Sequence, residues 1–189
     1  MNAIVAYFNQ PLLKIPLLFG LGTGVLSFGY FLALYAFGIP PLGNHKSLDF
    51  GITIILMTAA VWYYRRTVGH GMLHLWEGLT ICFLVNLVGA FISGWLIYLF
   101  ITYADPGVFA QYLENSRNLI LTGQKELTEK LGADQFRNVL AEVAKTQPHD
   151  LIYDEVGKKT VLGVLPILVI SLIFRKQDYS VINPEPPTR

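Results

Sequence analysis

The amino-acid sequence contains few charged residues for its length. Of its 189 residues, 14% are Asp, Glu, Lys or Arg, whereas soluble domains have about 25%. A hydrophobic fraction of 53% and a mean hydropathy of +0.47 accompany that shortage, so we expect a protein that faces lipid. Because 14 basic and 13 acidic residues nearly cancel, the chain has no global basic field, and nucleic acid is not an expected partner.

Cysteine and catalytic motifs are equally scarce. The single cysteine, Cys82, lies within an apolar run, and one cysteine cannot form a disulfide within the chain. The sequence has no nucleophile elbow, no HExxH motif and no phosphate-binding glycine loop. We therefore expect neither enzymatic activity nor a cofactor.

What the sequence does contain is long apolar runs. The segment from Gly78 to Ile101 carries no formal charge, and as an α-helix of about 24 residues it would be about 36 Å long. That length crosses a hydrocarbon core of about 30 Å. Other runs complete a set of four predicted spans, at residues of about 12–38, 48–64, 77–103 and 158–174.

Two of these spans have distinctive ends or interruptions. The second ends in a cluster of aromatic residues followed by Arg65 and Arg66, which is typical of a membrane interface. The fourth is short and contains Pro166, which we expect to kink it. The predicted fold class is an all-α integral membrane protein with four transmembrane helices and a helical extracytoplasmic insertion between the third and the fourth.

The insertion is the polar stretch 105–157. Asp105-Pro106 is a helix-start signal, and apolar residues then recur at helical spacing until Gln147-Pro148. We expect two or three amphipathic helices whose apolar faces either pack against one another or bind a partner. The candidate interaction residues are Phe109, Tyr112, Leu113, Phe136, Leu140 and Val143.

The basic residues that flank the predicted spans indicate an orientation. Five of them fall on one side of the membrane if there are four spans: Lys14, Arg65, Arg66, Arg175 and Lys176. By the positive-inside rule, both termini are cytoplasmic and the insertion lies outside. The proline-containing tail, residues 180–189, is predicted to be disordered.

Small and polar residues within the spans are candidates for helix packing. Gly20 and Gly24 form a GxxxG pair, which lets another helix approach closely, although glycine is also common in membrane helices. Asn86 lies near the middle of the third span, where an interhelical hydrogen bond would contribute about 0.6–2 kcal/mol. Ser47 or Asp49 can cap the second helix.

His70, His74 and Glu77 form the most suggestive group of polar residues. If a helix begins near Gly69, the three share one face and could hold a metal ion or relay protons. The alternative is an interfacial turn with Glu77 at the positive end of a helix dipole. We favour the turn and predict no metal site, with these three residues as the candidates if one exists.

Three segments carry a family resemblance. They are the start of the third span from Gly69 to Gly78, its end with the following helix from Tyr103 to Glu114, and the segment from Ile170 to Lys176. With the four-span layout, they resemble the bacterial membrane family called domain of unknown function 4199. The resemblance implies the topology above in a bacterial inner membrane, and it implies no activity. His70 and His74 depart from the serine- or glycine-rich segment of that family, so any role for them would be specific to this chain.

Two functional hypotheses follow from these observations. In the first, the protein is a structural or interaction component of the cytoplasmic membrane whose insertion binds an envelope protein, another copy or the bilayer surface. In the second, it is a small transporter or metal-handling protein that uses His70, His74 and Glu77.

Overall fold

The regular elements of the described residues are helices, most of them gathered in one bundle. The structure, a computed structural model, describes residues 10–43, 46, 48–124, 128–129 and 132–176. The predicted disordered tail, 180–189, lies outside them. The helices are α2 (Pro11–Ala36), α3 (Asp49–Thr67), α4 (Leu75–Leu99) with its π-helical continuation η2 (Phe100–Ala104), α5 (Pro106–Thr122), α7 (Ala133–Lys145) and α8 (Asp150–Phe174).

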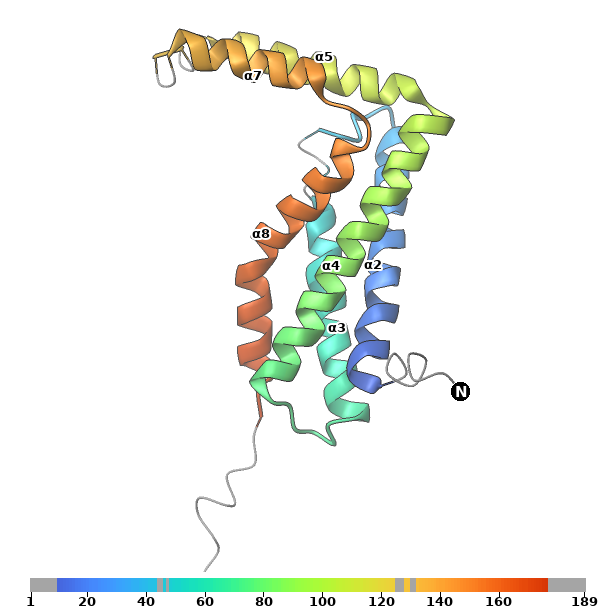
Figure 1. Ribbon diagram of the computed structural model, residues 1–189. Helices are drawn as coiled ribbons and strands as arrows, with labels where there is room; N and C mark the ends of the chain where they lie inside the picture. Colours follow the sequence, from blue (N-terminus) through green and yellow to red (C-terminus); the bar gives the residue numbers. More distant parts are fainter. Residues whose placement is uncertain (1–9, 44–45, 47, 125–127, 130–131, 177–189) are drawn as a thin grey trace, which may run out of the picture.

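The helices form a bundle with an arm at one end. Helices α2, α3, α4 and α8 run alongside one another, and α5 and α7 lie across one end of the bundle and extend past it (Figure 1). We call α5 and α7 the hairpin. Its start follows from the sequence, because the Asp105 carboxylate accepts a hydrogen bond from the Gly107 backbone N–H at 2.9 Å and so caps α5.

Three of the helices are long and apolar enough to cross a membrane. They are Pro11–Ala36, Leu75–Ala104 and Asp150–Phe174. Helix α3 is not among them. It has only 19 residues, and these include the charged residues Asp49, Arg65 and Arg66 at its two ends. The predicted second span therefore remains a prediction, although α3 runs alongside the other three helices (Figure 1).

The last helix differs from its predicted span. The predicted span begins at about residue 158, whereas α8 begins at Asp150, has 25 residues and so extends about two turns before the predicted span. Residues 150–157 are thus the first two turns of the last bundle helix. Its early turns are rich in charge, which made them resemble a solvated segment. Pro166 lies within α8, whose axis changes direction along its length (Figure 1).

The bundle interior has two apolar clusters. The cluster nearer the α3–α4 loop includes Met57, Val61, Ile81, Val85, Ile167 and Ile170. The cluster nearer the hairpin consists of Phe31, Ile97, Ile101, Val108 and Leu151. Between them along the helices lie eight buried polar residues, which we call the polar layer: Thr23, Ser27, Asp49, Thr53, Asn86, Ser93, Glu155 and Lys159.

Helix α4 is the centre of the bundle, and it packs most closely against α2 at glycine. A Cβ atom built on Gly24 would lie 2.5 Å from the Cβ of Ile92, and one built on Gly20 would lie 2.8 Å from the Cβ of Val88. Both separations are shorter than real side chains tolerate, so the two backbones can approach this closely only because α2 carries glycine at these positions.

Candidate functional site

The histidine group is not arranged as a helical face. Helix α4 begins at Leu75 with His74 at its N-cap, and His70 lies in the preceding turn with a φ of 48°. The hypothesis of a helix from Gly69 is therefore wrong. Within the described part of the chain, no three His, Cys, Asp or Glu residues are placed to hold a metal ion.

Glu77 has a structural role at this position. Its carboxylate accepts a hydrogen bond from the His74 backbone N–H at 2.8 Å and another from the Tyr64 hydroxyl at 3.1 Å. The first bond satisfies an N–H at the start of α4, and the second ties α4 to α3. Glu77 thus fixes the start of the central helix.

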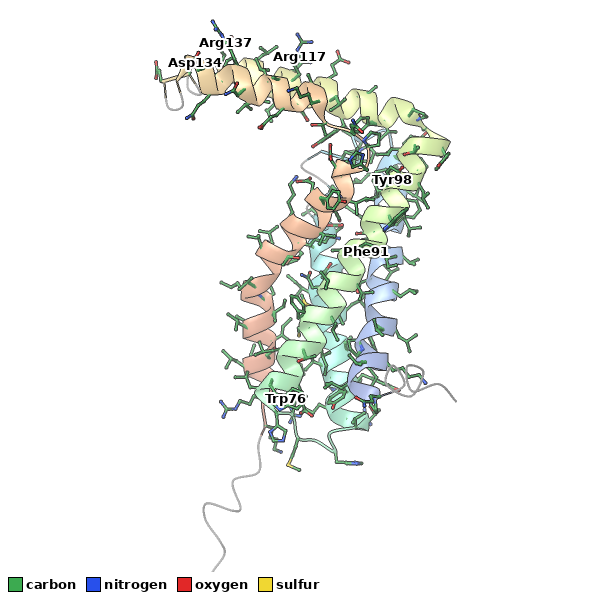
Figure 2. All side chains as sticks on the ribbon, in the orientation of Figure 1. Trp76, Phe91, Tyr98, Arg117, Asp134 and Arg137 are labelled. Carbon is green, nitrogen blue, oxygen red and sulfur yellow. The ribbon has the colours of Figure 1, made fainter. Side chains whose placement is uncertain are left out.

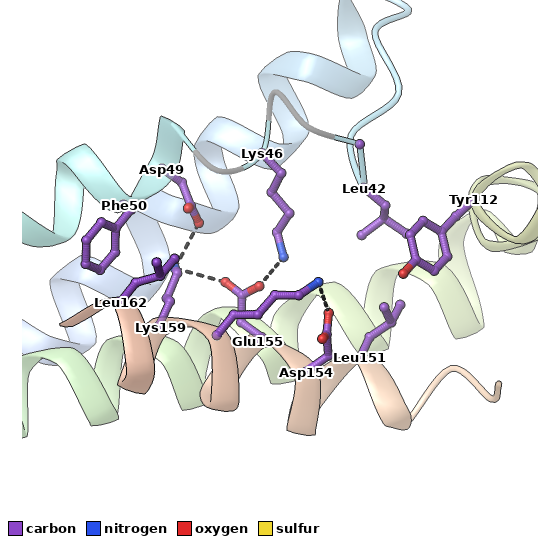
Figure 3. Close-up of a pocket in the computed structure, with 12 residues that line it drawn as sticks. Leu42, Lys46, Asp49, Phe50, Tyr112, Leu151, Asp154, Glu155, Lys159 and Leu162 are labelled. Atoms are coloured by element: carbon purple, nitrogen blue, oxygen red, sulfur yellow. Dashed lines mark hydrogen bonds and ion pairs between the residues drawn. The ribbon is translucent and has the colours of Figure 1, made fainter. Parts of the chain in front are cut away.

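Buried charges gather in the polar layer, between the two apolar clusters and away from the histidine group. Glu155 and Lys159 stand one turn apart on α8, and Asp49 belongs to the first turn of α3. The Lys159 ammonium lies 2.8 Å from Asp49 Oδ2 and 2.9 Å from Glu155 Oε1. Lys46, from the α2–α3 loop, pairs with the other oxygen of Glu155 (Figure 3). The charges therefore alternate along a chain of four side chains.

Hydroxyl and amide groups on α2 and α4 complete the surroundings of this chain. Ser93 donates a hydrogen bond to Glu155 Oε1 at 3.2 Å, and Lys159 donates to Ser27 Oγ at 3.4 Å. The Asn86 side-chain amide donates to the Lys159 backbone carbonyl at 2.9 Å. All four bundle helices thus contribute to the surroundings of Asp49 and Lys159, the two most deeply buried charges. Ion pairing and hydrogen bonds of this kind are needed to offset the free energy of removing charges from water.

A more exposed ion pair lies at the edge of these four side chains. Lys158 Nζ is 2.6 Å from Asp154 Oδ2, and the two side chains are 66% and 43% exposed. We call these six residues the charge cluster: Lys46, Asp49, Asp154, Glu155, Lys158 and Lys159. Three are basic and three acidic, so their formal charges cancel.

The charge cluster lines a cavity. It has a volume of about 100 Å³, and its apolar walls include Leu42, Phe50 and Leu162 (Figure 3). A second cavity, of about 520 Å³, lies between α5 and the α2–α3 loop. Lys158 lines both cavities.

The distance along the helices indicates how deep the buried charges lie in the membrane. Asp49 is 16 residues before Arg65 on α3, and Lys159 is 16 residues before Arg175, which follows α8. At 1.5 Å per residue, both lie about 24 Å from the basic ends of their helices. If those arginines mark one face of a hydrocarbon core of about 30 Å, the buried charges lie near the opposite face rather than at mid-depth.

Comparison with known proteins identifies a family. A family model described as "Protein of unknown function (DUF4199)" matches residues 18–176. The chain belongs to this family. The resemblance inferred from the three sequence segments is thereby confirmed. Neither a curated protein nor a solved structure matches the chain. With its three apolar helices, the chain is a multi-pass membrane protein of an uncharacterised family.

The charge cluster of this DUF4199 protein was not predicted from the sequence, for two reasons. Ser47 or Asp49 was expected to cap α3, but Leu48 occupies the cap position and the Asp49 side chain is buried. Residues 154–159 were assigned largely to the insertion. A usable signal was present: the buried face of α8 repeats at intervals of three or four residues through Leu151, Glu155, Lys159, Gly163, Ile167 and Ile170.

The expected interaction residues of the hairpin are mostly turned inward. Phe109 and Tyr112 pack against the apolar cluster nearer the hairpin, and Phe136 is 7% exposed. Leu113, Leu140 and Val143 are half-buried. Because α5 and α7 contact each other, self-packing accounts for much of this burial, and binding to a partner remains a prediction.

Proposed function

We propose that this DUF4199 protein is a four-span component of the bacterial inner membrane that acts by interaction through its hairpin. The observation that carries the proposal is the hairpin's position: it crosses one end of the bundle and continues beyond it (Figure 1). Among the described residues of the hairpin, those that join the bundle core lie at the base of α5: Val108, Phe109 and Tyr112. An arm that contributes so little to the bundle core has its outer part free for another molecule.

The two sides of the hairpin differ in polarity. Arg117, Asp134 and Arg137 project away from the bundle (Figure 2). Leu119 is 72% exposed. It comes two positions after Arg117, and residues two positions apart on an α-helix point about 200° apart, so Leu119 lies on the opposite side of α5 from Arg117. In the proposal, the apolar side rests at the bilayer surface, and the charged side faces an envelope protein.

The orientation of the proposal follows from charge. The five basic flanking residues lie at the ends of helices α2, α3 and α8 that are remote from the hairpin. Basic flanks favour the cytoplasmic side, so the termini are cytoplasmic and the hairpin is extracytoplasmic in this proposal. The transporter alternative loses support, because its histidine face is absent and transporter sites typically lie near mid-depth.

Site-specific labelling of intact cells tests the orientation. In a Cys82→Ala background, Gln124→Cys places one thiol at an exposed position just beyond the end of α5. Met72→Cys is the matched control, since Met72 is exposed in the α3–α4 loop. A membrane-impermeant maleimide is expected to label position 124 in intact cells and position 72 only after permeabilisation. The reverse pattern would show the opposite orientation.

Crosslinking from the same two positions tests the interaction. A photoreactive maleimide at position 124 is expected to give one discrete heteromeric product in cells, whereas position 72 gives none. A product of twice the chain's mass would show that the partner is a second copy of the chain and not another envelope protein. If position 124 yields only the monomer, as position 72 does, the interaction proposal is wrong.

A further inference from the structure

The geometry points to a second site, independent of the hairpin proposal. We propose that the charge cluster binds the headgroup of a zwitterionic phospholipid with a primary ammonium, of the phosphatidylethanolamine class. The headgroup enters the cavity between α3 and α8, and one acyl chain lies along α8.

The charge balance of the cluster selects a zwitterion. Its three lysines and three carboxylates sum to zero, whereas sites for anionic lipids carry an excess of lysine and arginine. Both signs are also accessible at the edge of the cavity, because Lys158 and Asp154 are 66% and 43% exposed. A phosphate can bind the lysine while the lipid ammonium binds the carboxylates.

The donor chemistry distinguishes the ammonium type. Asp154 lines the cavity and its side chain is 43% exposed, so its carboxylate can accept from a primary ammonium, which has three N–H groups to donate. A quaternary ammonium has none and is recognised by aromatic faces instead. The cluster therefore fits ethanolamine better than choline.

The depth of the edge residues matches a headgroup. Lys158 is 17 residues and Asp154 is 21 residues before Arg175, which corresponds to about 26 Å and about 32 Å along the helix. These values straddle the far boundary of a hydrocarbon core of about 30 Å. Phosphate and ammonium groups of lipids occupy this level.

An apolar stripe leads from the cluster into the hydrocarbon region. Starting from Lys158, residues at intervals of three or four along α8 share one face of the helix. Four large apolar side chains on that face are 45–71% exposed. They are Leu162, Leu165, Val169 and Leu172. Leu162 also lines the cavity, so the stripe begins at the headgroup site and can hold an acyl chain.

The edge pair can change partners without unfolding the bundle. Lys158 and Asp154 are an exposed i,i+4 pair, and such pairs contribute little to stability. The pair Lys159–Asp49 is buried and stays in place as the floor of the site. Edge variants are therefore a fair test of binding.

The test measures lipid retention by the purified full-length protein in detergent. Native mass spectrometry after addition of phosphatidylethanolamine, phosphatidylglycerol or phosphatidylcholine counts bound lipids, and thermal unfolding reports the shift in Tm. We expect one retained phosphatidylethanolamine and a rise in Tm, with at least tenfold weaker retention of the other two lipids. Inorganic phosphate should give no shift, which separates a lipid from a free anion.

The key variant exchanges the edge charges. Asp154→Lys with Lys158→Asp keeps the i,i+4 pair and the net charge but inverts the positions of the two signs, and it should lower phosphatidylethanolamine retention at least tenfold. Lys158→Ala provides a second variant if the exchange does not fold. Arg137→Ala, an exposed charge on the hairpin (Figure 2), should retain the lipid normally. Equal retention of phosphatidylglycerol, or undiminished retention in the edge variants, would falsify the proposal.

Discussion

Helices α4 and α8 both contain a long apolar stretch, but they differ in how deeply that stretch is buried. Each contains an 18-residue stretch apolar enough to cross a membrane, yet 44% of that stretch is buried in the helix that contains α4 and 28% in α8. Helix α4 contacts α2, α3 and α8, whereas the contacts of α8 are mainly with α4. Hydropathy therefore identifies both as membrane helices without telling which one forms the core.

The residues that distinguish the two helices are small or polar. Gly89, Ser93 and Gly94 are buried on α4, while α8 buries Glu155 and Lys159 and exposes most of its large apolar residues. Lipid chains are as apolar as leucine, so burial in a membrane gains little from hydrophobicity and depends on close packing and hydrogen bonds. Three experiments test this contrast.

The largest effect is expected from Lys159→Met on α8. It leaves Asp49 buried without its cation, and breaking a buried pair costs about 3–5 kcal/mol of the free energy of unfolding. The measurement is unfolding of the purified protein by SDS titration. The double variant Lys159→Met with Asp49→Leu removes both charges and should recover most of the loss. A single variant as stable as the wild type would show that the pair contributes nothing.

Gly24→Leu on α2 should have the next largest effect, because it disrupts the packing against α4. A Cβ at Gly24 already lies 2.5 Å from Ile92, so overpacking should cost about 2–3 kcal/mol. Gly29→Leu is the matched control, since no described atom lies within 4 Å of a Cβ there. The same SDS titration compares the two, and equal stability would contradict the close α2–α4 contact.

The smallest effects come from a matched pair of isoleucines. Ile97 on α4 is 1% exposed and Ile173 on α8 is 70% exposed. Ile97→Ala should cost about 2 kcal/mol by leaving a cavity, whereas Ile173→Ala should change stability by less than about 0.5 kcal/mol. Thermal unfolding in one detergent measures both. Similar losses would mean that α8 is covered by protein rather than by lipid.

Particular residues show how far the sequence could be interpreted. Asp105 was correctly identified as the start of α5, because a carboxylate before proline has a local capping chemistry that no distant contact changes. His74 and Glu77 were correctly located near a helix start, and the favoured turn is present, with a positive φ at His70. Because α4 begins at Leu75, the alternative of a helix from Gly69 with a shared face is wrong.

The candidate site was the least predictable part. Its six charged residues come from the α2–α3 loop, α3 and α8, more than a hundred residues apart in the sequence. Glu155 and Lys159 form an i,i+4 pair, which on its own is typical of a solvated helix. Their burial depends on partners outside α8: Lys46, Asp49 and the serines on α2 and α4.

The sequence by itself determined the membrane character, the apolar runs and the local starts of several helices, because these depend on composition and on short-range hydrogen bonding. The tertiary structure alone decided which helix is central, where α8 begins and which charges are paired. Those features depend on contacts between helices, and in lipid the contacts are selected by shape and by the need to pair every buried polar group.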